Sequence, residues 1–474
     1  MKLIATALSV LFLSACGGGS TPAVSGTTTV PIAPIAPITT DYLVELKVSS
    51  TPDYTYGAIA ASTMVQGMQS QPAGSFVYAG LDGKAHHFIF PTLFYADPQL
   101  PGLEFVEKTD GTFGFLRFID DVKMGSARDW APLNVGSKAE KRFVVVDHGS
   151  EYSAGQSTWP FGDVWVASDK GAGFDFTKIS TVRAFNHSVA VGDISGSGRD
   201  DIVVVNMGVK TGGVNSSLHH YVQNADGSFT QDRDFLQNTN PAQSGAVAIA
   251  DLDNDGVPEM VQGNYVLYDA ATDWGGVRVW SRKNSSSYQV ASTIPRSGNL
   301  TEKMGVTQIV AFDYDKDGLL DLLVSLEGAT PDASVRYNAN GVELYRNVGG
   351  LRFQRVTDAM FKQSVWLFSR NQYRELSVVD FDLDGYVDIV LRGWNGSEFK
   401  PQPNGTLNIG SLLLKNNVGT GFLTQSDKTG LSEFFGASNL PKYLRISGME
   451  NGALKLFGVN QSGAPVQFTV KKNR

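Results

Sequence analysis

Residues 309–325 read IVAFDYDKDGLLDLLVS, and this stretch decides the fold. Its two ends are runs of apolar and β-branched residues, which are typical of buried strands. The loop between them, DYDKDGLLD, begins at Asp313 and ends at Asp321. Glycine at its sixth position, Gly318, permits a turn with positive φ, so that the acids at alternate positions point towards one centre. The stretch therefore predicts two strands joined by a cation-binding loop.

This pattern of strand, acidic loop and strand occurs four times along the chain. The copies are VAVGDISGSGRDDIVVV (189–205), VAIADLDNDGVPEMVQG (247–263), IVAFDYDKDGLLDLLVS (309–325) and LSVVDFDLDGYVDIVLR (376–392). Their first aspartates are separated by 58, 62 and 67 residues, and a recurring period of this kind indicates a repeat architecture. After each copy an apolar run, a turn and an aromatic run follow, at 218–231, 277–290, 342–355 and 411–424. Each period thus offers four short antiparallel strands, which is typical of a propeller blade.

The repeats resemble the FG-GAP/VCBS family, whose fold is the β-propeller of integrin α-subunits. The resemblance covers 189–425, is weaker at 143–178 and 76–118, and leaves 443–470 as a last blade that has no metal loop. We therefore expect an all-β fold for residues 41–474, a seven-bladed β-propeller of four-stranded antiparallel blades with calcium-binding loops. The segment 42–48 is expected to complete the last blade and close the ring, which removes exposed sheet edges.

The loops carry oxygen ligands at positions one, three, five and nine, and the carbonyl at position seven adds another. Six or seven hard oxygens at flexible distances suit Ca²⁺ better than Mg²⁺. An EF-hand is excluded, because position twelve is Gln262, Val324 or Leu391 in the three acid-rich copies, whereas that loop needs Glu. The predicted ligands, loop by loop, are Asp193, Ser195, Ser197 and Asp201; Asp251, Asp253, Asp255 and Glu259; Asp313, Asp315, Asp317 and Asp321; and Asp380, Asp382, Asp384 and Asp388. Because the first loop has two serines in place of acids, we expect three strong calcium sites and one weaker site. The alternative is a set of solvated Asp-Gly turns.

The N-terminus resembles a bacterial lipoprotein signal. Residues 1–15 have one lysine and a short apolar run, and the sequence Leu-Ser-Ala before Cys16 matches a lipobox. Cys16 is the only cysteine, so a disulfide framework and a multi-thiolate zinc site are excluded. The resemblance implies a lipid anchor on Cys16, a Pro/Gly/Thr-rich tether over 16–40, and a monomeric body held at the bacterial cell envelope, on the outer membrane. An ordinary secretory signal is the alternative.

The acidic balance, 47 Asp and Glu against 39 Lys and Arg, argues against nucleic-acid binding. The chain has no H-E-x-x-H, G-x-S-x-G or P-loop motif. The pairs His86–His87 and His219–His220 are expected in strands, with at least one ring of each pair facing solvent. A short helix is expected within 356–375.

Long loops at 148–162, 262–276, 326–341 and 392–408 are rich in aromatic residues, and in this family they lie on the face opposite the calcium loops. Their tryptophans Trp159, Trp274 and Trp394 are candidate ligand-binding residues for a protein or polysaccharide. The alternative is that these rings pack under their own loops. Two functions remain: a non-enzymatic recognition, adhesion or assembly module, and a polysaccharide-processing enzyme, lyase or hydrolase, built on a calcium-binding propeller.

Overall fold

The structure is a computed structural model of the chain, in which residues Thr40–Arg474 form one compact unit. The residues that it describes are 42–48, 74–90, 101–125, 127–134, 140–149, 161–169, 171, 173–206, 217–232, 244–265, 276–284, 287–295, 304–328, 339–361, 373–380, 382–393, 411–424, 443–450, 453–459 and 465–472. Cys16, Trp159, Trp274 and Trp394 lie outside these residues, so the predictions about them stay predictions.

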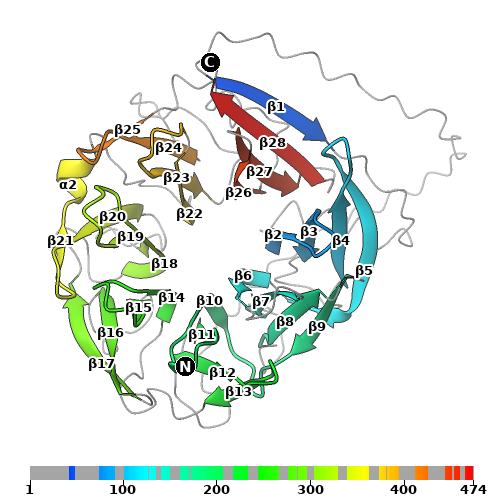
Figure 1. The fold of residues 1–474 in the computed structure, drawn as a ribbon, viewed down its shortest axis with the longest axis horizontal. Helices are drawn as coiled ribbons and strands as arrows, with labels where there is room; N and C mark the ends of the chain where they lie inside the picture. The colour runs from blue at the N-terminus through cyan, green and yellow to red at the C-terminus, as the bar shows by residue number, and fades with distance from the viewer. Residues whose placement is uncertain are drawn as a thin grey trace, which may run out of the picture. The chain divides into compact units, whose positions relative to one another are not determined.

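The described residues form seven four-stranded antiparallel sheets (Figure 1). The first three are β2 (Gly74–Ala79), β3 (Ala85–Phe90), β4 (Pro101–Glu107) and β5 (Phe113–Lys123); β6 (Ala127–Leu133), β7 (Lys141–Asp147), β8 (Val164–Asp169) and β9 (Phe174–Lys178); and β10 (Asn186–Gly192), β11 (Asp201–Asn206), β12 (Leu218–Gln223) and β13 (Phe229–Asp232). The next three are β14 (Ser244–Ala250), β15 (Glu259–Asn264), β16 (Val277–Asn284) and β17 (Ser287–Ile294); β18 (Met304–Phe312), β19 (Asp321–Gly328), β20 (Ala339–Asn347) and β21 (Phe353–Arg355); and β22 (Tyr373–Val379), β23 (Asp388–Gly393), β24 (Ser411–Asn416) and β25 (Phe422–Thr424). The seventh contains β26 (Tyr443–Glu450), β27 (Ala453–Val459), β28 (Pro465–Lys472) and β1 (Tyr42–Val48). The expected all-β architecture of four-stranded antiparallel sheets is confirmed.

Each sheet contacts the next through its first strand. β2 contacts β6, and the series continues through β10, β14, β18 and β22 to β26, which contacts β2 again. The sheets thus follow one another in a closed β-propeller succession (Figure 1). In the seventh sheet the chain supplies β1 from its N-terminal side, and β1 pairs with β28 from Tyr42 opposite Lys472 to Val48 opposite Val466. The expected role of the strand at 42–48 is confirmed.

The core lies between neighbouring sheets. Phe88 of β3, for example, packs against Phe143 of β7 and Phe174 of β9, with ring centroids 5.2 and 5.1 Å apart. The second strands are therefore covered on both faces, and every residue of β11 and β15 is buried. This explains why these strands read as continuous apolar runs instead of alternating with polar residues.

Two local predictions have different outcomes. The expected short helix is present as α2 (Thr357–Met360). The expectation that one ring of each histidine pair faces solvent is wrong: His86 and His87 are 4% and 0% exposed, and His219 and His220 are 7% and 3% exposed. Both pairs belong to inner strands of their sheets, β3 and β12, whose two faces are packed against neighbouring blades.

Candidate metal centres

The four acidic loops occupy equivalent places in four consecutive sheets. Each one joins the first strand of its sheet to the second, and we call them loop 1 (193–201), loop 2 (251–259), loop 3 (313–321) and loop 4 (380–388). Loop 2, for example, leaves β14 after Ala250 and enters β15 at Glu259. The sequence prediction that a hairpin between two strands carries each acidic motif is therefore confirmed.

The backbone of each loop is folded around its first aspartate. In loop 3 the Gly318 amide donates to Asp313 Oδ2 at 3.0 Å, and in loop 4 the Gly385 amide donates to Asp380 Oδ2 at 2.8 Å. The position-six glycines have φ between 76° and 88°, and a Cβ at Gly198, Gly256 or Gly318 would meet no atom within 4 Å. Glycine is therefore favoured at position six because of the positive φ angle, and not because a larger side chain would lack room.

Position four adopts the same left-handed backbone, which sequence reasoning missed. The φ angles of Asn254, Lys316 and Leu383 are 61°, 60° and 59°. In loop 1 this position is Gly196, with φ 73°. Each loop therefore contains two left-handed residues, at positions four and six, within nine residues.

Three of the loops bring carboxylates together. In each group the oxygens lie within 4.8 Å of one another, and the groups are Asp251, Asp253 and Asp255; Asp313, Asp315 and Asp321; and Asp380, Asp382 and Asp388. Of the other predicted ligands in these loops, Glu259, Asp317 and Asp384 lie outside the groups. Loop 1 has only two acids at ligand positions, Asp193 and Asp201, since its third acid, Asp200, stands at position eight. Asp193 accepts hydrogen bonds from the amides of Ser197 and Gly198, both at 2.8 Å.

Buried oxygens that have no hydrogen-bond partner indicate that these loops fit a cation. Asp313 Oδ1 in loop 3 and the hydroxyls of Ser195 and Ser197 in loop 1 are all buried and unpartnered. A buried polar oxygen without a partner costs free energy, which a coordinated cation would offset. The donor set of carboxylates, hydroxyls and carbonyls suits a hard cation such as Ca²⁺.

The raised pKa values of one acid in loop 2 and one acid in loop 3 also indicate that these loops fit a cation. Burial, together with the neighbouring aspartates, raises the pKa of Glu259 to about 7. Burial and the charges of Asp315 and Asp317 likewise raise the pKa of Asp321 to about 7. Carboxylates that repel one another in a dry site are stabilised in their charged form when a cation lies between them.

Loop 1 differs in having an internal counter-charge. Its Asp201 is fully buried and lies 3.6 Å from His220 Nε2. Burial acts to raise the pKa of Asp201, but the hydrogen bonds from His220, Gln223 and Ser195 outweigh it and lower the pKa. Two acids, one of them already paired, agree with the expectation of weaker cation binding at loop 1.

Two basic side chains reach the loops from the third strand of the same sheet. Arg346 of β20 lies 2.8 Å from Asp315 and 3.0 Å from Asp317 in loop 3. Lys415 of β24 contacts Asp382 and lies 3.0 Å from Asp384 in loop 4. These residues stand 29 to 33 positions beyond the acids they meet. The acidic motif does not predict that Arg346 and Lys415 contact the loops. Only the pairing of the strands shows it.

In loops 1, 2 and 3 the residue at position two packs against the following sheet. Ile194, Leu252 and Tyr314 are 1%, 0% and 2% exposed. Leu252 packs in a core cluster with Leu322 and Tyr345 of the fifth sheet, and Tyr314 packs with Leu414 and Phe422 of the sixth. The candidate metal loops therefore lie at the junctions between neighbouring blades.

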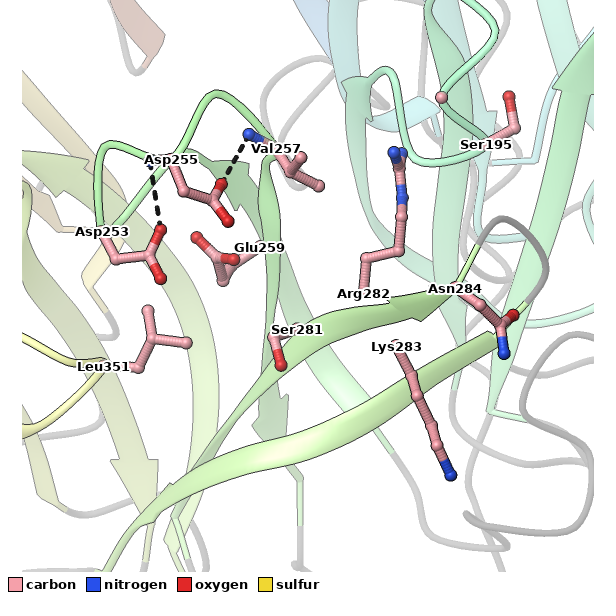
Figure 2. A pocket seen from close by; sticks show the side chains of 11 residues that line it. Ser195, Asp253, Asp255, Val257, Glu259, Ser281, Arg282, Lys283, Asn284 and Leu351 are labelled. Carbon is pink, nitrogen blue, oxygen red and sulfur yellow. Dashed lines mark hydrogen bonds between the residues drawn. The ribbon is translucent and has the colours of Figure 1, made fainter.

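A cavity opens between loops 1 and 2. Figure 2 shows Asp253, Asp255 and Glu259 gathered on one side, while Arg282 extends towards the loop that carries Ser195. The Arg282 guanidinium donates to the Asp193 carbonyl at 2.7 Å and also contacts the Ile194 carbonyl. The cavity is thus polar, and its acids are those of loop 2.

None of the six histidines is more than 8% exposed, and all six lie in the described part of the chain. His148 and His187 meet through their Nε2 atoms at 3.2 Å, and the His187 ring lies 5.2 Å from that of Tyr265. This aromatic contact joins three consecutive sheets, and nothing in the sequence pattern predicted it. No helix within the described ranges has the length and hydropathy that crossing a bilayer requires.

Comparison with known proteins agrees with the geometry of the loops. Residues 193–261, which contain loops 1 and 2, match the FG-GAP-like repeat family. Comparison with curated protein sequences gave no match. Among solved structures, the N-terminal domain of Nup159 is similar over 91% of this chain and 96% of that one, with 8% identity and a TM-score of 0.45, values too low to inform function. The chain therefore carries an FG-GAP-like repeat within a β-propeller, and its later sheets repeat the same loop.

Proposed function

We propose that the protein is a calcium-stabilised, seven-bladed β-propeller that acts as a non-enzymatic recognition, adhesion or assembly module on the bacterial cell envelope. The observation that carries the proposal is the convergence of three acids in each of loops 2, 3 and 4, among which Asp321, Asp382 and Asp388 are buried. The seven described sheets, closed by the pairing of β1 with β28, support the blade count. Anchoring through a lipid on Cys16 completes the proposal and rests on the lipobox alone.

Calcium would be held by the acids of loops 2, 3 and 4, and more weakly by Asp193, Ser195, Ser197 and Asp201 of loop 1. The bound ion supplies positive charge to acids that otherwise repel one another. An ion that binds only the folded state stabilises it by roughly 2.7 kcal/mol when calcium is at 100 times its Kd. The effect is structural, because the loops lie between blades and not in a reaction centre.

Recognition, and not catalysis, fits the described side chains better. A general acid or base must reach its substrate, and all six histidines are buried. A rigid ring of sheets that presents loops from successive blades is instead suited to binding a protein or a polysaccharide. The predicted contact residues are Trp159, Trp274 and Trp394, in the loops that follow the second strands. The enzymatic alternative would need a reactive group other than histidine.

The proposal is tested by removing calcium. We expect excess EGTA to lower the Tm by several degrees and to abolish capture of ligands in a glycan array and a protein pull-down, with added calcium restoring both. The combined variant Asp251→Asn, Asp313→Asn and Asp380→Asn should show the low Tm at any calcium concentration. Asp226→Asn is the matched control, since Asp226 lies in an exposed Asp-Gly turn between β12 and β13. An identical Tm with and without calcium, after metal removal is verified, would contradict the proposal.

A further inference from the structure

Two buried asparagines connect consecutive metal loops. Asn347 is the last residue of β20, Asn416 is the last residue of β24, and both are 0% exposed. They therefore stand at equivalent places at the ends of the third strands of neighbouring sheets. Each one has contacts with two loops, the loop of its own sheet and the loop of the preceding sheet.

The main chain of each asparagine is held by its own loop. The Asn347 amide donates to Asp321 Oδ1 at 2.8 Å, and the Asn416 amide donates to Asp388 Oδ1 at 2.7 Å. Asp321 and Asp388 are the position-nine acids of loops 3 and 4 and belong to the acid groups. One end of each connection is therefore a candidate metal ligand.

The side chain of each asparagine reaches the preceding loop. Asn347 Nδ2 donates to the Leu252 carbonyl of loop 2 at 2.7 Å, and Asn416 Nδ2 donates to the Tyr314 carbonyl of loop 3 at 2.7 Å. The second Nδ2 proton of each goes to position eight of its own loop, at Leu320 and Val387. Each Oδ1 accepts a hydrogen bond from an amide of the following turn, so each side chain uses both donor protons and also its oxygen.

The position-two residue completes the path, because its amide is bound by its own loop's last acid. The Leu252 amide donates to Glu259 Oε2 at 2.9 Å, and the Tyr314 amide donates to Asp321 Oδ2 at 3.1 Å. A continuous series of hydrogen bonds thus runs from Glu259 through Leu252 and Asn347 to Asp321. It continues through Tyr314 and Asn416 to Asp388.

We infer that Asn347 and Asn416 couple the cation sites of loops 2, 3 and 4, so that binding at one loop raises the affinity of the next. The inference rests on the proposed calcium binding. A cation that fixes the acids of one loop also fixes the position-two carbonyl or the position-nine acid on which the asparagine depends. The neighbouring loop is then already ordered when its own cation arrives.

Loop 1 lies outside this path and supplies an internal control. Gln223 ends β12 as the asparagines end their strands, and its amide donates to Asp201 at 2.9 Å. Loop 1 meets the next sheet through Arg282 and through the Tyr288 hydroxyl, which donates to the Ile194 carbonyl at 3.2 Å. At this junction Arg282, and not an asparagine, reaches the position-two carbonyl of the preceding loop.

The test is a calcium titration of the full chain by isothermal calorimetry. We expect the native protein to bind with a Hill coefficient above one, and Asp251→Asn in loop 2 to weaken binding at loop 3 by about tenfold. In Asn347→Leu, which keeps the volume but removes the donors, the same Asp251→Asn change should leave loop 3 unaffected. Gln223→Leu is the matched control and should retain the full coupling.

Asn416→Leu provides an independent second variant, with loop 3 and loop 4 as the pair. Circular dichroism at saturating calcium establishes that each variant is folded, and Asn416→Leu carries the test if Asn347→Leu does not fold. Absence of calcium binding by the native protein would overturn the proposed function. Normal binding with the same coupling in the native protein and in the folded asparagine variants would overturn only this inference.

Discussion

At the scale of single residues, Arg346 and Lys415 act on loops 3 and 4 as built-in cations. Each one contacts the acids at positions three and five of its own loop. Loop 2 faces Ser281 and Arg282 instead, and the Arg282 guanidinium is turned to loop 1. Loops 3 and 4 thus hold a balancing charge that loop 2 lacks.

We predict that Lys415→Met raises the calcium affinity of loop 4. The lysine competes with the ion for Asp382 and Asp384, and a partly exposed pair of this kind contributes about 1 kcal/mol, or roughly a fivefold change in affinity. Isothermal calorimetry in a background with Asp251→Asn and Asp313→Asn leaves loop 4 as the only acid-rich loop with all its acids, beside the weaker site of loop 1. Lys108→Met, which removes the same charge from the exposed turn between β4 and β5, should leave the affinity unchanged; a fall in affinity on Lys415→Met would contradict the prediction.

The acids and glycines of the loops could be predicted because the residues that make one loop are adjacent in the chain. The spacing from Asp313 to Asp321 predicted that Asp313, Asp315 and Asp321 converge, although it also included Asp317, which lies outside their group. Arg346 and Asn347 could not be predicted, because they reach loop 3 only through the pairing of β19 with β20. The sequence contains both partners, but nothing local indicates that they meet.

At the scale of elements, the end of the third strand is the recurring point of attachment between blades. Asn347 and Asn416 donate to a carbonyl of the preceding sheet. In a sheet without a metal loop, Asp169 ends β8 and its carboxylate instead accepts the Leu81 amide of the preceding hairpin, at 2.7 Å. The end of the third strand thus still forms a hydrogen bond to the preceding sheet, but in this sheet it supplies the acceptor instead of the donor. This contact between blades therefore does not depend on the metal motif.

The inner strands also explain why the histidine prediction was wrong. In an ordinary two-layer sheet, adjacent residues of a strand point to opposite faces, and one face meets water. Here His87 packs against Phe113 and Phe457, while His86 packs against Phe88 and Phe174. Both faces of β3 are interior, and a single strand's sequence does not reveal how many sheets will cover it.

The buried pair of His86 and Glu104 predicts a pH dependence of stability. Burial acts to lower the pKa of His86, but its hydrogen bonds and charge interactions with Glu104 and Asp82 outweigh burial and raise the pKa above 6.5. This contribution is fully present below pH 6.5 and is lost as the pH rises through the raised pKa. We expect the Tm of His86→Gln, measured between pH 6 and 9 in calcium, to fall less with rising pH than that of the native protein.

His219→Gln is the contrasting variant. Burial lowers the pKa of His219 to about 4, so its neutral form is favoured in the folded state. Stability from this group is lost as the pH falls through 6.5 towards 4, and its removal should change the profile in the opposite direction. Parallel profiles for the native protein and His86→Gln would contradict the assignment of His86.

At the scale of the whole molecule, closure depends on one pair of strands. β1 covers the outer edge of β28 over seven paired positions. Without it that edge would present unpaired amides and carbonyls, which promote association between molecules. The blades with candidate metal loops are 3 to 6 in chain order, so the closing sheet has no candidate cation site among its own described residues.

We predict that a chain lacking residues 1–48 melts several degrees below one lacking residues 1–40. The shorter chain loses the hydrogen bonds of β1 and leaves β28 open, so it should also self-associate at concentrations at which the longer chain stays monomeric. Differential scanning calorimetry and analytical ultracentrifugation measure the two effects. Equal Tm values would indicate that β1 does not stabilise the closed form.

The whole-molecule arrangement was predictable to the extent that the repeat is regular. Loops 1 to 4 predict four of the sheets. The aromatic runs that follow these loops in the sequence predict the outer strands of the same sheets. The first two sheets and the seventh lack the acidic loop and were predicted from strand rhythm alone. The pairing of Tyr42 with Lys472 was expected only because a closed architecture needs it, since no local signal links the two ends.

The pairing of β1 with β28 also determines at what stage of synthesis the seventh sheet can be completed. β1 is synthesised before the other described strands, and its partner β28 is synthesised after them. The early blades can form during translation, but β1 stays without its partner until β28 has been made. A chain that lacks β28 would retain most of its core. Its β1 strand would have no partner, and this unpaired segment would be open to cleavage by a protease.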